Sequence, residues 1–215
     1  FSGGGDPFYY KHLLETVKKL KDTPIQFASL TNGANLKGEV AEIFAHHATW
    51  LRISIDGWDD KSYAQYRGIK EGEFTKLLKN MKDFKAYRGK CALGVSYIVD
   101  NKNYDHIYEF VKLIKSTGAD SIKISPCVIS NESKDNDDYH KPLFDEVQSQ
   151  IAEAKKDFED EKFEIYNSYH LFGDEINKTY HWCPYMQVLP VIGADLNIYP
   201  CQDKAYNLEN GLVGS

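Results

Sequence analysis

A glycine-rich segment at the start of the chain is the first part of the sequence whose residue types could do chemistry. Residues 1–7 read Phe-Ser-Gly-Gly-Gly-Asp-Pro, so three glycines separate the end of an expected strand from an acid and a proline. Glycine allows positive φ and close approach of the backbone to a ligand, and proline suits the first turn of a helix. The spacing is neither that of a phosphate-binding loop nor that of a dinucleotide-binding loop. We expect a strand–loop–helix joint that presents backbone polar groups to a small molecule, with a plain tight turn as the alternative.

Groups suited to ligand binding also follow or end the strands expected further along the chain. They are Thr31-Asn32-Gly33, Ser54 with Asp56-Gly57, and residues 94–99 with Tyr97. Ligands of parallel α/β proteins bind at the carboxyl ends of the strands, so we expect these segments and the glycine loop to meet at one edge of a sheet. Their carbonyls, hydroxyls, carboxylates and apolar wall suit a ligand with an amino-acid head, a ribose and a purine.

An alternation of strands and helices would position these groups. From apolar spacing, the expected helices span residues 8–21, 38–47, 73–88, 104–116 and 143–160, and the expected strands span 25–30, 50–55, 91–99, 121–125 and 163–166. A long loop is expected between 58 and 72, and a polar loop or excursion over 131–142. The alternation implies a parallel sheet with right-handed crossovers, in either a doubly wound sheet or an open or closed barrel.

The pattern changes after about residue 170. Residues 187–193 and 196–201 are expected to form a hairpin around Ala194-Asp195. We therefore predict two domains, 1–170 and 171–215, the second a small truncated β-hairpin module. Cys183 and Cys201 fall in it, whereas Cys91 and Cys127 fall in apolar strand-like runs, where a buried thiol behaves as a small hydrophobic residue.

The composition argues against several classes of protein. The 215 residues, of which 42% are hydrophobic, are enough for one sizeable core. The net charge of −6, without a long run of one sign, argues against a nucleic-acid or anionic-membrane partner. No stretch approaches the roughly 20 apolar residues of a membrane span, and no signal peptide is visible. The chain lacks an initiating Met and starts at the end of an expected strand, so we interpret it as an excerpt of a longer, cytoplasmic protein.

The motifs resemble those of one enzyme family. The segment F-S-G-G-G-D-P looks like the glycine-glycine-acid motif of radical S-adenosylmethionine (SAM) enzymes, which is usually Gly-Gly-Glu-Pro, and L-T-N-G, R-I-S-I-D-G and Y-R-G look like the next landmarks of that family, in the same order. The resemblance covers the chain to about residue 130. It implies a partial (β/α)6, TIM-like barrel of which strands two to six are present.

The resemblance also implies a binding site for SAM. The implied contacts are those of Gly4, Gly5 and Asp6 with the amino group, Ser54 with the ribose or carboxylate, Arg67 with the carboxylate, and Tyr97 and Val99 with the adenine, beside Asn32 and Asp56 at the same strand ends. Asp6 stands where the family usually has glutamate. Because its side chain is shorter, the resemblance does not decide whether it forms a salt bridge to the SAM amine.

The family's cysteine triplet is absent from this sequence. Members carry C-x3-C-x2-C before the glycine motif, where it binds three irons of a 4Fe–4S cluster whose fourth iron takes SAM. We expect the triplet upstream of Phe1, so the excerpt alone should be inactive. In the full protein the resemblance implies an electron donor such as a flavodoxin or ferredoxin, reductive cleavage of SAM, and a 5′-deoxyadenosyl radical that abstracts a substrate hydrogen.

A second resemblance concerns the late cysteines. Cys183-Pro184 and the segment A-D-L-N-I-Y-P-C ending at Cys201 look like the hairpin of SPASM and twitch modules, typically P-D-G-x-V-Y-P-C, which bind auxiliary iron–sulfur clusters. Leu196 stands where the glycine of that hairpin usually falls. Two thiolates brought together are half of a four-cysteine cluster site. A zinc site of Cys183, Cys201 and His181 or His170, or two unconnected cysteines, are the alternatives.

These resemblances predict a radical SAM enzyme that acts on a peptide, a protein or a small molecule. Two other classes stay open. One is a non-catalytic barrel that binds a nucleoside or a peptide. The other is a metal-independent α/β-barrel enzyme that uses Asp56 and Asp6 as acid and base.

Overall fold

The structure is a computed structural model that describes residues 1–2, 5–130, 132–171, 184–193 and 195–201. The chain divides into two compact units, residues 1–173 and 174–215. Within the described residues, every helix is too short or too polar to cross a bilayer.

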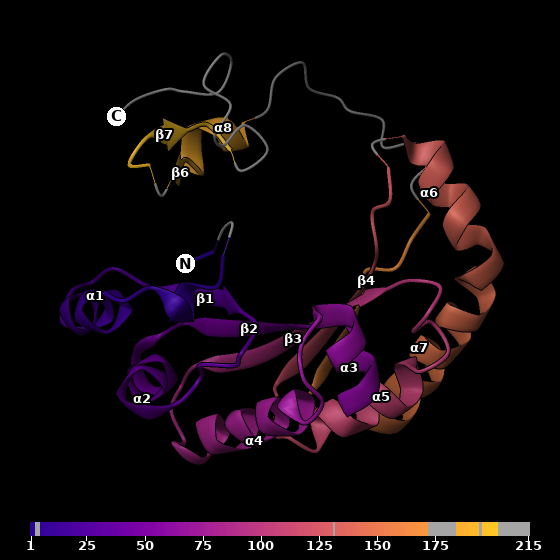
Figure 1. Cartoon of the computed structure of the whole chain (residues 1–215), viewed down its shortest axis with the longest axis horizontal. Coiled ribbons are helices and arrows are strands. Elements are labelled where there is room, and N and C mark those ends of the chain that lie inside the picture. Colours follow the sequence, from indigo (N-terminus) through magenta and orange to yellow (C-terminus); the bar gives the residue numbers. More distant parts are fainter. Residues whose placement is uncertain (3–4, 131, 172–183, 194, 202–215) are drawn as a thin grey trace. The chain divides into compact units, whose positions relative to one another are not determined.

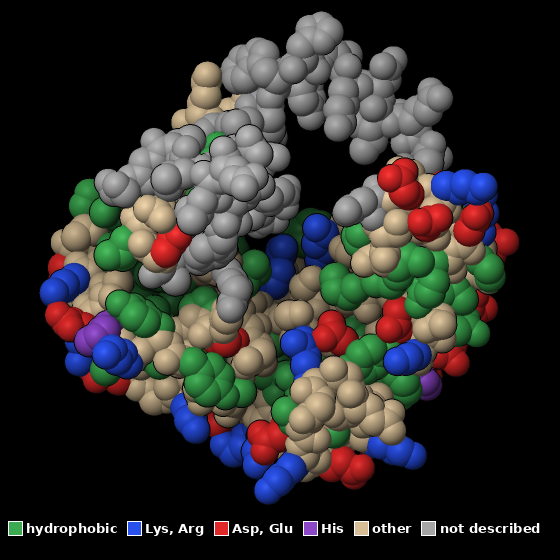
Figure 2. Space-filling model, turned by 45° about the horizontal axis from the view of Figure 1, so that its top comes forward, with side chains coloured by type: hydrophobic (Ala, Val, Ile, Leu, Met, Phe, Trp, Pro, Cys, Tyr) green, Lys and Arg blue, Asp and Glu red, His purple; other side chains and the backbone are tan. Residues whose placement is uncertain are grey.

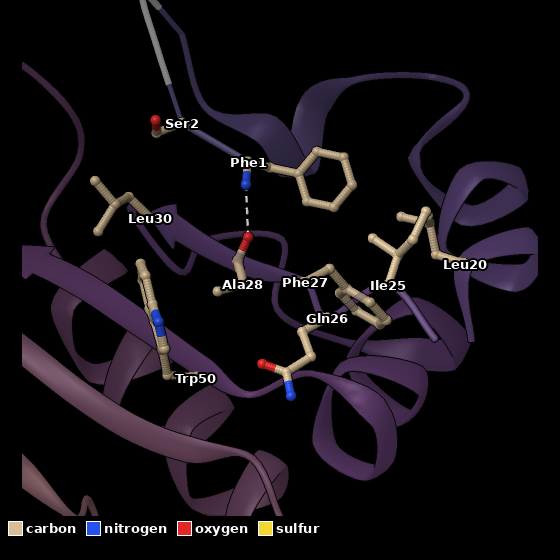
Figure 3. A pocket seen from close by; sticks show the side chains of 9 residues that line it. All are labelled: Phe1, Ser2, Leu20, Ile25, Gln26, Phe27, Ala28, Leu30 and Trp50. Atoms are coloured by element: carbon tan, nitrogen blue, oxygen red, sulfur yellow. Dashed lines mark hydrogen bonds between the residues drawn. The ribbon is translucent and has the colours of Figure 1, made fainter. Parts of the chain in front are cut away.

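The larger unit is built on a parallel sheet with the order β1-β2-β3-β4-β5 (Figure 1). Its strands are β1 (Ala28–Thr31), β2 (Trp50–Ile55), β3 (Ala92–Val99), β4 (Ser121–Pro126) and β5 (Glu164–Asn167). Phe1 extends the sheet beyond β1, because its amino group donates to the Ala28 carbonyl at 2.5 Å and its carbonyl accepts from Leu30 N at 3.0 Å (Figure 3). The backbone of Phe1 therefore pairs with β1 without forming an assigned strand, and every strand of the sheet lies beside the one that precedes it in sequence.

Helices cover one face of this sheet. The unit contains the short 3-10 turns η1 (Pro7–Tyr9) and η2 (Lys141–Leu143), and the helices α1 (Leu13–Leu20), α2 (Gly38–His47), α3 (Asp60–Arg67), α4 (Glu73–Ala86), α5 (Ile107–Lys115), α6 (Ser133–His140) and α7 (Phe144–Phe158). Figure 1 shows α2, α4, α5 and α7 on the same side of the sheet.

Burial alternates along the strands in agreement with this arrangement. Ile53, Val95 and Ile122 are fully buried on the helix side, whereas their neighbours in sequence on the other face are less buried in β2 and β4. A doubly wound sheet would bury both faces. The larger unit is therefore a partial barrel, which confirms the predicted fold class.

The helix α3 was not predicted, since residues 58–72 were expected to form a long loop. Its sequence is polar, but a capping box starts it: Asp59 accepts from Ser62 N at 2.6 Å, and Ser62 Oγ accepts from Asp59 N at 3.0 Å. Gly68, with φ 62°, ends it in the left-handed conformation that glycine adopts without strain.

The prediction of a loop over 131–142 was also wrong, because α6 and η2 occupy most of it. The Asn136 side chain is buried and fixes the segment before the helix. It accepts from Ile129 N and donates to the Ser130 carbonyl, both at 2.8 Å. Local side-chain hydrogen bonds thus help to hold a helix whose Asn and Asp residues have weak helix propensity.

The smaller unit contains α8 (Tyr185–Val188) and a hairpin of β6 (Val191–Ile192) and β7 (Ile198–Tyr199). The strands are antiparallel, with Val191 opposite Tyr199, so the predicted hairpin is confirmed. Its first strand is shorter than expected because residue 187 lies in α8. Leu196, which stands at the position of the expected glycine, has a φ of 66°, a conformation that favours glycine.

Candidate functional site

The loop before η1 is fastened to the end of β1 by the acid of the glycine motif. The Asp6 carboxylate accepts from Phe8 N and the Thr31 hydroxyl, each at 2.9 Å, and from the backbone N of Asn32. These bonds cap η1 and hold its loop against the end of β1, so the side chain has a structural use inside the protein. Gly4 lies outside the described residues, and Gly5 has open space where a side chain would be.

The turn after β1 requires its glycine. Gly33 has a φ of 74°, and a Cβ atom there would lie 2.4 Å from the Leu77 Cδ1 atom. The Asn80 side chain on α4 donates to the Gly33 carbonyl at 3.0 Å. The Asn32 side chain accepts from Ala34 N at 2.9 Å, so it also shapes this turn.

Three of the predicted residues meet at the end of β2. The Arg67 guanidinium lies 2.7 Å from the Asp56 carboxylate and donates to the Ser54 carbonyl at 3.0 Å, with the Ser54 hydroxyl at 3.4 Å. The unexpected helix α3 makes this possible. It follows β2 in sequence, and its last residue, Arg67, lies at the end of that strand. The Arg67 Nε atom is buried and has no hydrogen-bond acceptor among the residues that the structure describes. Such an unsatisfied donor is uncommon in a native protein and calls for a functional explanation.

The electrostatic surroundings of Asp56 favour a positive charge. Burial raises the pKa of this carboxyl group, and the Asp100 carboxylate raises it further, while the Arg67 guanidinium opposes both effects. A cationic group placed beside Asp56 and Asp100 would therefore be stabilised by charge that is incompletely balanced within the protein.

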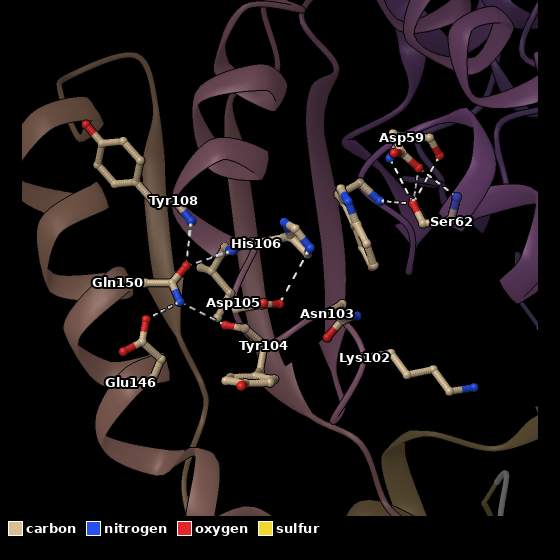
Figure 4. A network of polar contacts seen from close by, with 12 residues as sticks. Asp59, Ser62, Lys102, Asn103, Tyr104, Asp105, His106, Tyr108, Glu146 and Gln150 are labelled. Carbon is tan, nitrogen blue, oxygen red and sulfur yellow. Dashed lines mark hydrogen bonds and ion pairs between the residues drawn. The ribbon is translucent and has the colours of Figure 1, made fainter.

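A residue without a sequence signal joins the ends of β2 and β3. Asn103 is fully buried, and its amide donates to the carbonyls of Asp56 and Ile98 at 3.0 and 2.9 Å. Its Oδ1 atom accepts from Asp100 N at 2.9 Å. Figure 4 shows Asn103 near the polar network at the N-terminus of α5. The side chain thus sets the spacing of the two strand ends that carry the site.

The side chains of Tyr97 and Val99 do not line the open face of the sheet, contrary to the prediction of an adenine-binding wall. Both are fully buried on the helix side, where the Tyr97 ring stacks on Phe110 at 4.2 Å. Because successive strand residues point to opposite faces, Ser96 and Ile98 face the other side. Only the backbone of residues 97 and 99 can contribute to a site there.

The described residues do not supply ligands for a metal cluster. Among them, no group of three or more His, Cys, Asp and Glu side chains is close enough to hold a metal ion. Cys183 and His181 lie outside the described residues, and Cys201 is partly buried. Cys91 is buried, as expected, but Cys127 is partly exposed after β4, with its Sγ atom 3.7 Å from His140 Nε2.

The fold and these strand ends define a radical SAM barrel domain, and the sequence places the chain in that family. Residues 1–114 match the sequence model of the Radical SAM superfamily. This match spans more than half of the chain, so the chain belongs to the radical SAM superfamily, as its motifs predicted. Membership implies SAM and a 4Fe–4S cluster as cofactors.

Individual relatives agree with this assignment. A probable GTP 3′,8-cyclase of Sulfolobus acidocaldarius is 27% identical over 122 residues, which are 56% of this chain and 38% of the cyclase. The solved structure of Streptococcus suis SuiB bound to S-adenosylmethionine has a TM-score of 0.70 at 18% identity and covers 99% of this chain and 51% of SuiB.

The solved structure of anSMEcpe with bound AdoMet and Kp18Cys peptide has a TM-score of 0.61 at 18% identity, over 100% of this chain and 63% of that protein. At these identities, the two solved structures show a shared fold. The chain spans less than two thirds of the length of all three relatives.

Proposed function

We propose that the carboxyl ends of β1, β2 and β3 bind SAM in a radical SAM enzyme that acts on a peptide or protein. The observation that carries this proposal is the meeting of Ser54, Asp56 and Arg67 at one strand end of a domain of this family. The Asp6 carboxylate is hydrogen-bonded to Thr31 and Asn32, so this acid and the turn at Asn32 belong to the same edge of the sheet, and we propose that Gly4 and Gly5 bind SAM with them.

The groups of this edge fit the parts of SAM. The negative surroundings of Asp56 suit the ammonium or sulfonium charge, and the Arg67 guanidinium and Ser54 hydroxyl suit the carboxylate. The buried Arg67 Nε would gain an acceptor if the guanidinium turned from Asp56 toward a ligand. The adenine would lie along the backbone near Ile98, since the ring of Tyr97 lies on the far side.

The bound SAM and a reduced 4Fe–4S cluster would supply a radical that removes a hydrogen atom from the substrate. In this proposal the described residues bind and orient SAM. They hold no group of side chains that could ligate that cluster. A peptide or protein substrate is supported by the shared fold of anSMEcpe, solved with a peptide. We further propose that Cys183 and Cys201 hold an auxiliary cluster, that a flavodoxin or ferredoxin donates electrons, and that the enzyme is cytoplasmic.

Calorimetric titration of SAM into the anaerobically reconstituted full-length protein tests the proposal. Arg67→Ala should weaken SAM binding roughly 10- to 100-fold, the range for a lost charge-assisted hydrogen bond. Ser54→Ala should weaken it less. Lys82→Ala, an exposed change on α4, should leave binding unchanged. Reduction should then release 5′-deoxyadenosine. A cluster-loaded protein that fails to bind SAM would contradict the proposal.

A further inference from the structure

The open face of the sheet carries two positive charges. The parallel register aligns Arg52 with Gly94 and Ser121 in one row across the strands, and Ser54 with Ser96 and Lys123 in the next. Since Ile53, Val95 and Ile122 face the helices, the alternation of side chains places Arg52 and Lys123 on the opposite face. Both are partly buried.

The Arg52 side chain lies across the neighbouring strand. Its Nε atom is 3.5 Å from the place that a Cβ of Gly94 would occupy, and its Cζ atom is 5.8 Å from the centre of the Trp50 ring. The Arg52 side chain therefore lies within van der Waals reach of the position of Gly94 on β3. The row that contains Arg52, Gly94 and Ser121 continues to Glu164 on β5. The carboxylate of Glu164 accepts a hydrogen bond from the Tyr166 hydroxyl.

Neither cation has a carboxylate partner among the residues that the structure describes. Elsewhere in the unit the chain does provide such partners: Lys85 lies 2.7 Å from Asp120, and Lys115 lies 2.5 Å from Asp160. Buried charges are normally paired, and Arg52 and Lys123 are partly withdrawn from water. Arg52 and Lys123 therefore differ from Lys85 and Lys115, and the lack of a carboxylate partner for them among the described residues leaves both cations available to an anionic ligand.

The two cations are placed to hold one group between them. They lie two strands and one row apart, which corresponds to about 12 Å between their Cα atoms. Long side chains can close that distance from both sides over the small residues Gly94 and Ser96. The Ser96 hydroxyl adds a further donor at this position.

Apolar side chains continue the same face toward β1. Leu30 and Trp50 are 43% and 42% exposed and help to line a pocket of about 420 Å³ with Phe1 and Ile25 (Figure 3). Figure 2 shows basic side chains grouped near the centre of its view, next to apolar ones. A ligand that spans this face would need an anionic group beside an apolar one.

We propose that Arg52 and Lys123 bind the side-chain carboxylate of an acidic residue in the peptide substrate, with an apolar residue of the peptide near Trp50. This inference deepens the proposed function and rests on it. Both oxygens of an aspartate or glutamate carboxylate can accept from the guanidinium, and one of them can also accept from the ammonium, whereas the neutral amide counterpart would leave both cations without an opposite charge.

The test uses the SAM-loaded full-length protein and two capped pentapeptides. One has a central glutamate flanked by alanine and leucine, and the other has glutamine instead, so that the carboxylate is the only difference. Calorimetry should show the glutamate peptide binding at least about tenfold more tightly. Arg52→Gln and Lys123→Gln should each reduce this preference, while Lys82→Gln, the same charge change on the exposed side of α4, should preserve it. Circular dichroism checks that the variants fold.

Other outcomes overturn the inference. If Arg52→Gln and Lys123→Gln weaken SAM but leave the peptide preference intact, the two cations serve the carboxylate of SAM. If inorganic phosphate binds and the glutamate peptide does not, the site takes a phosphate. Equal binding of both peptides by the folded wild type also refutes it. Absence of SAM binding is a different result, which counts against the proposed function.

Discussion

The substitution Asn103→Ala tests whether one buried amide holds the two strand ends of the site. The side chain satisfies two backbone carbonyls and one backbone N–H. Its removal leaves these three backbone groups without this hydrogen-bond partner. They lie around a side chain that is itself fully buried.

The expected loss is about 3 kcal/mol of unfolding free energy. A buried polar group without a partner costs about 1–3 kcal/mol, and we take the lower end for each of three groups because Asp56 and Asp100 are only partly buried. This corresponds to a change of more than about 100-fold in the ratio of folded to unfolded protein.

Urea denaturation followed by circular dichroism measures this loss as a lower midpoint with an unchanged slope. Asn101→Ala is the matched control, since Asn101 is exposed in the same loop and should change stability by less than about 0.5 kcal/mol. Asn103→Asp should also destabilise, because it sets a carboxylate against two carbonyl oxygens. Its folded-state pKa would be raised, so the loss should shrink as pH falls through that value. A loss below about 1 kcal/mol for Asn103→Ala would refute the reasoning.

Three further changes have outcomes set by local structure. Gln150→Ala should cost about 1–3 kcal/mol in urea denaturation, because this α7 side chain accepts from the N-terminal amides of α5 at 3.0 and 3.3 Å; no loss would show that the α5 terminus finds other partners. Gly33→Ala should destabilise by at least about 1 kcal/mol, since it meets Leu77 at a positive φ, and a thermal scan that matches wild type would contradict this. Cys91 has a pKa raised to about 12, so native alkylation at pH 8, read by mass spectrometry, should be about a thousandfold slower than for a free thiol; rapid labelling would disprove its burial.

Much of the barrel could be predicted from periodicity alone. Buried strands such as β2 and amphipathic helices such as α2 have strong apolar patterns, and both were located to the residue. The helices α3 and α6 have few apolar residues, so the same reasoning treated them as loops. For α3, the pair Asp59 and Ser62 and the terminal Gly68 were a usable signal, because a capping box and a glycine stop mark the ends of a helix.

The candidate site was predicted less completely. The carboxyl ends of parallel strands identified Ser54 and Asp56 before any coordinates, since strand topology brings such residues together, whereas Arg67 was identified only through the resemblance to radical SAM enzymes. The orientation of Tyr97 was missed, although the alternation of burial along β3 could have shown it. Asn103 could not be found, because a single asparagine in a loop gains its role only when two distant strand ends meet around it.

The matching order of strands in space and in sequence has a consequence for synthesis on the ribosome. Each strand, once extruded with its helix, finds its pairing partner already made, and none has to wait for a segment that is still untranslated. Domains that emerge from the amino end tend to fold in that order. The strands from β1 to β5 can therefore pair in the order in which they are synthesised.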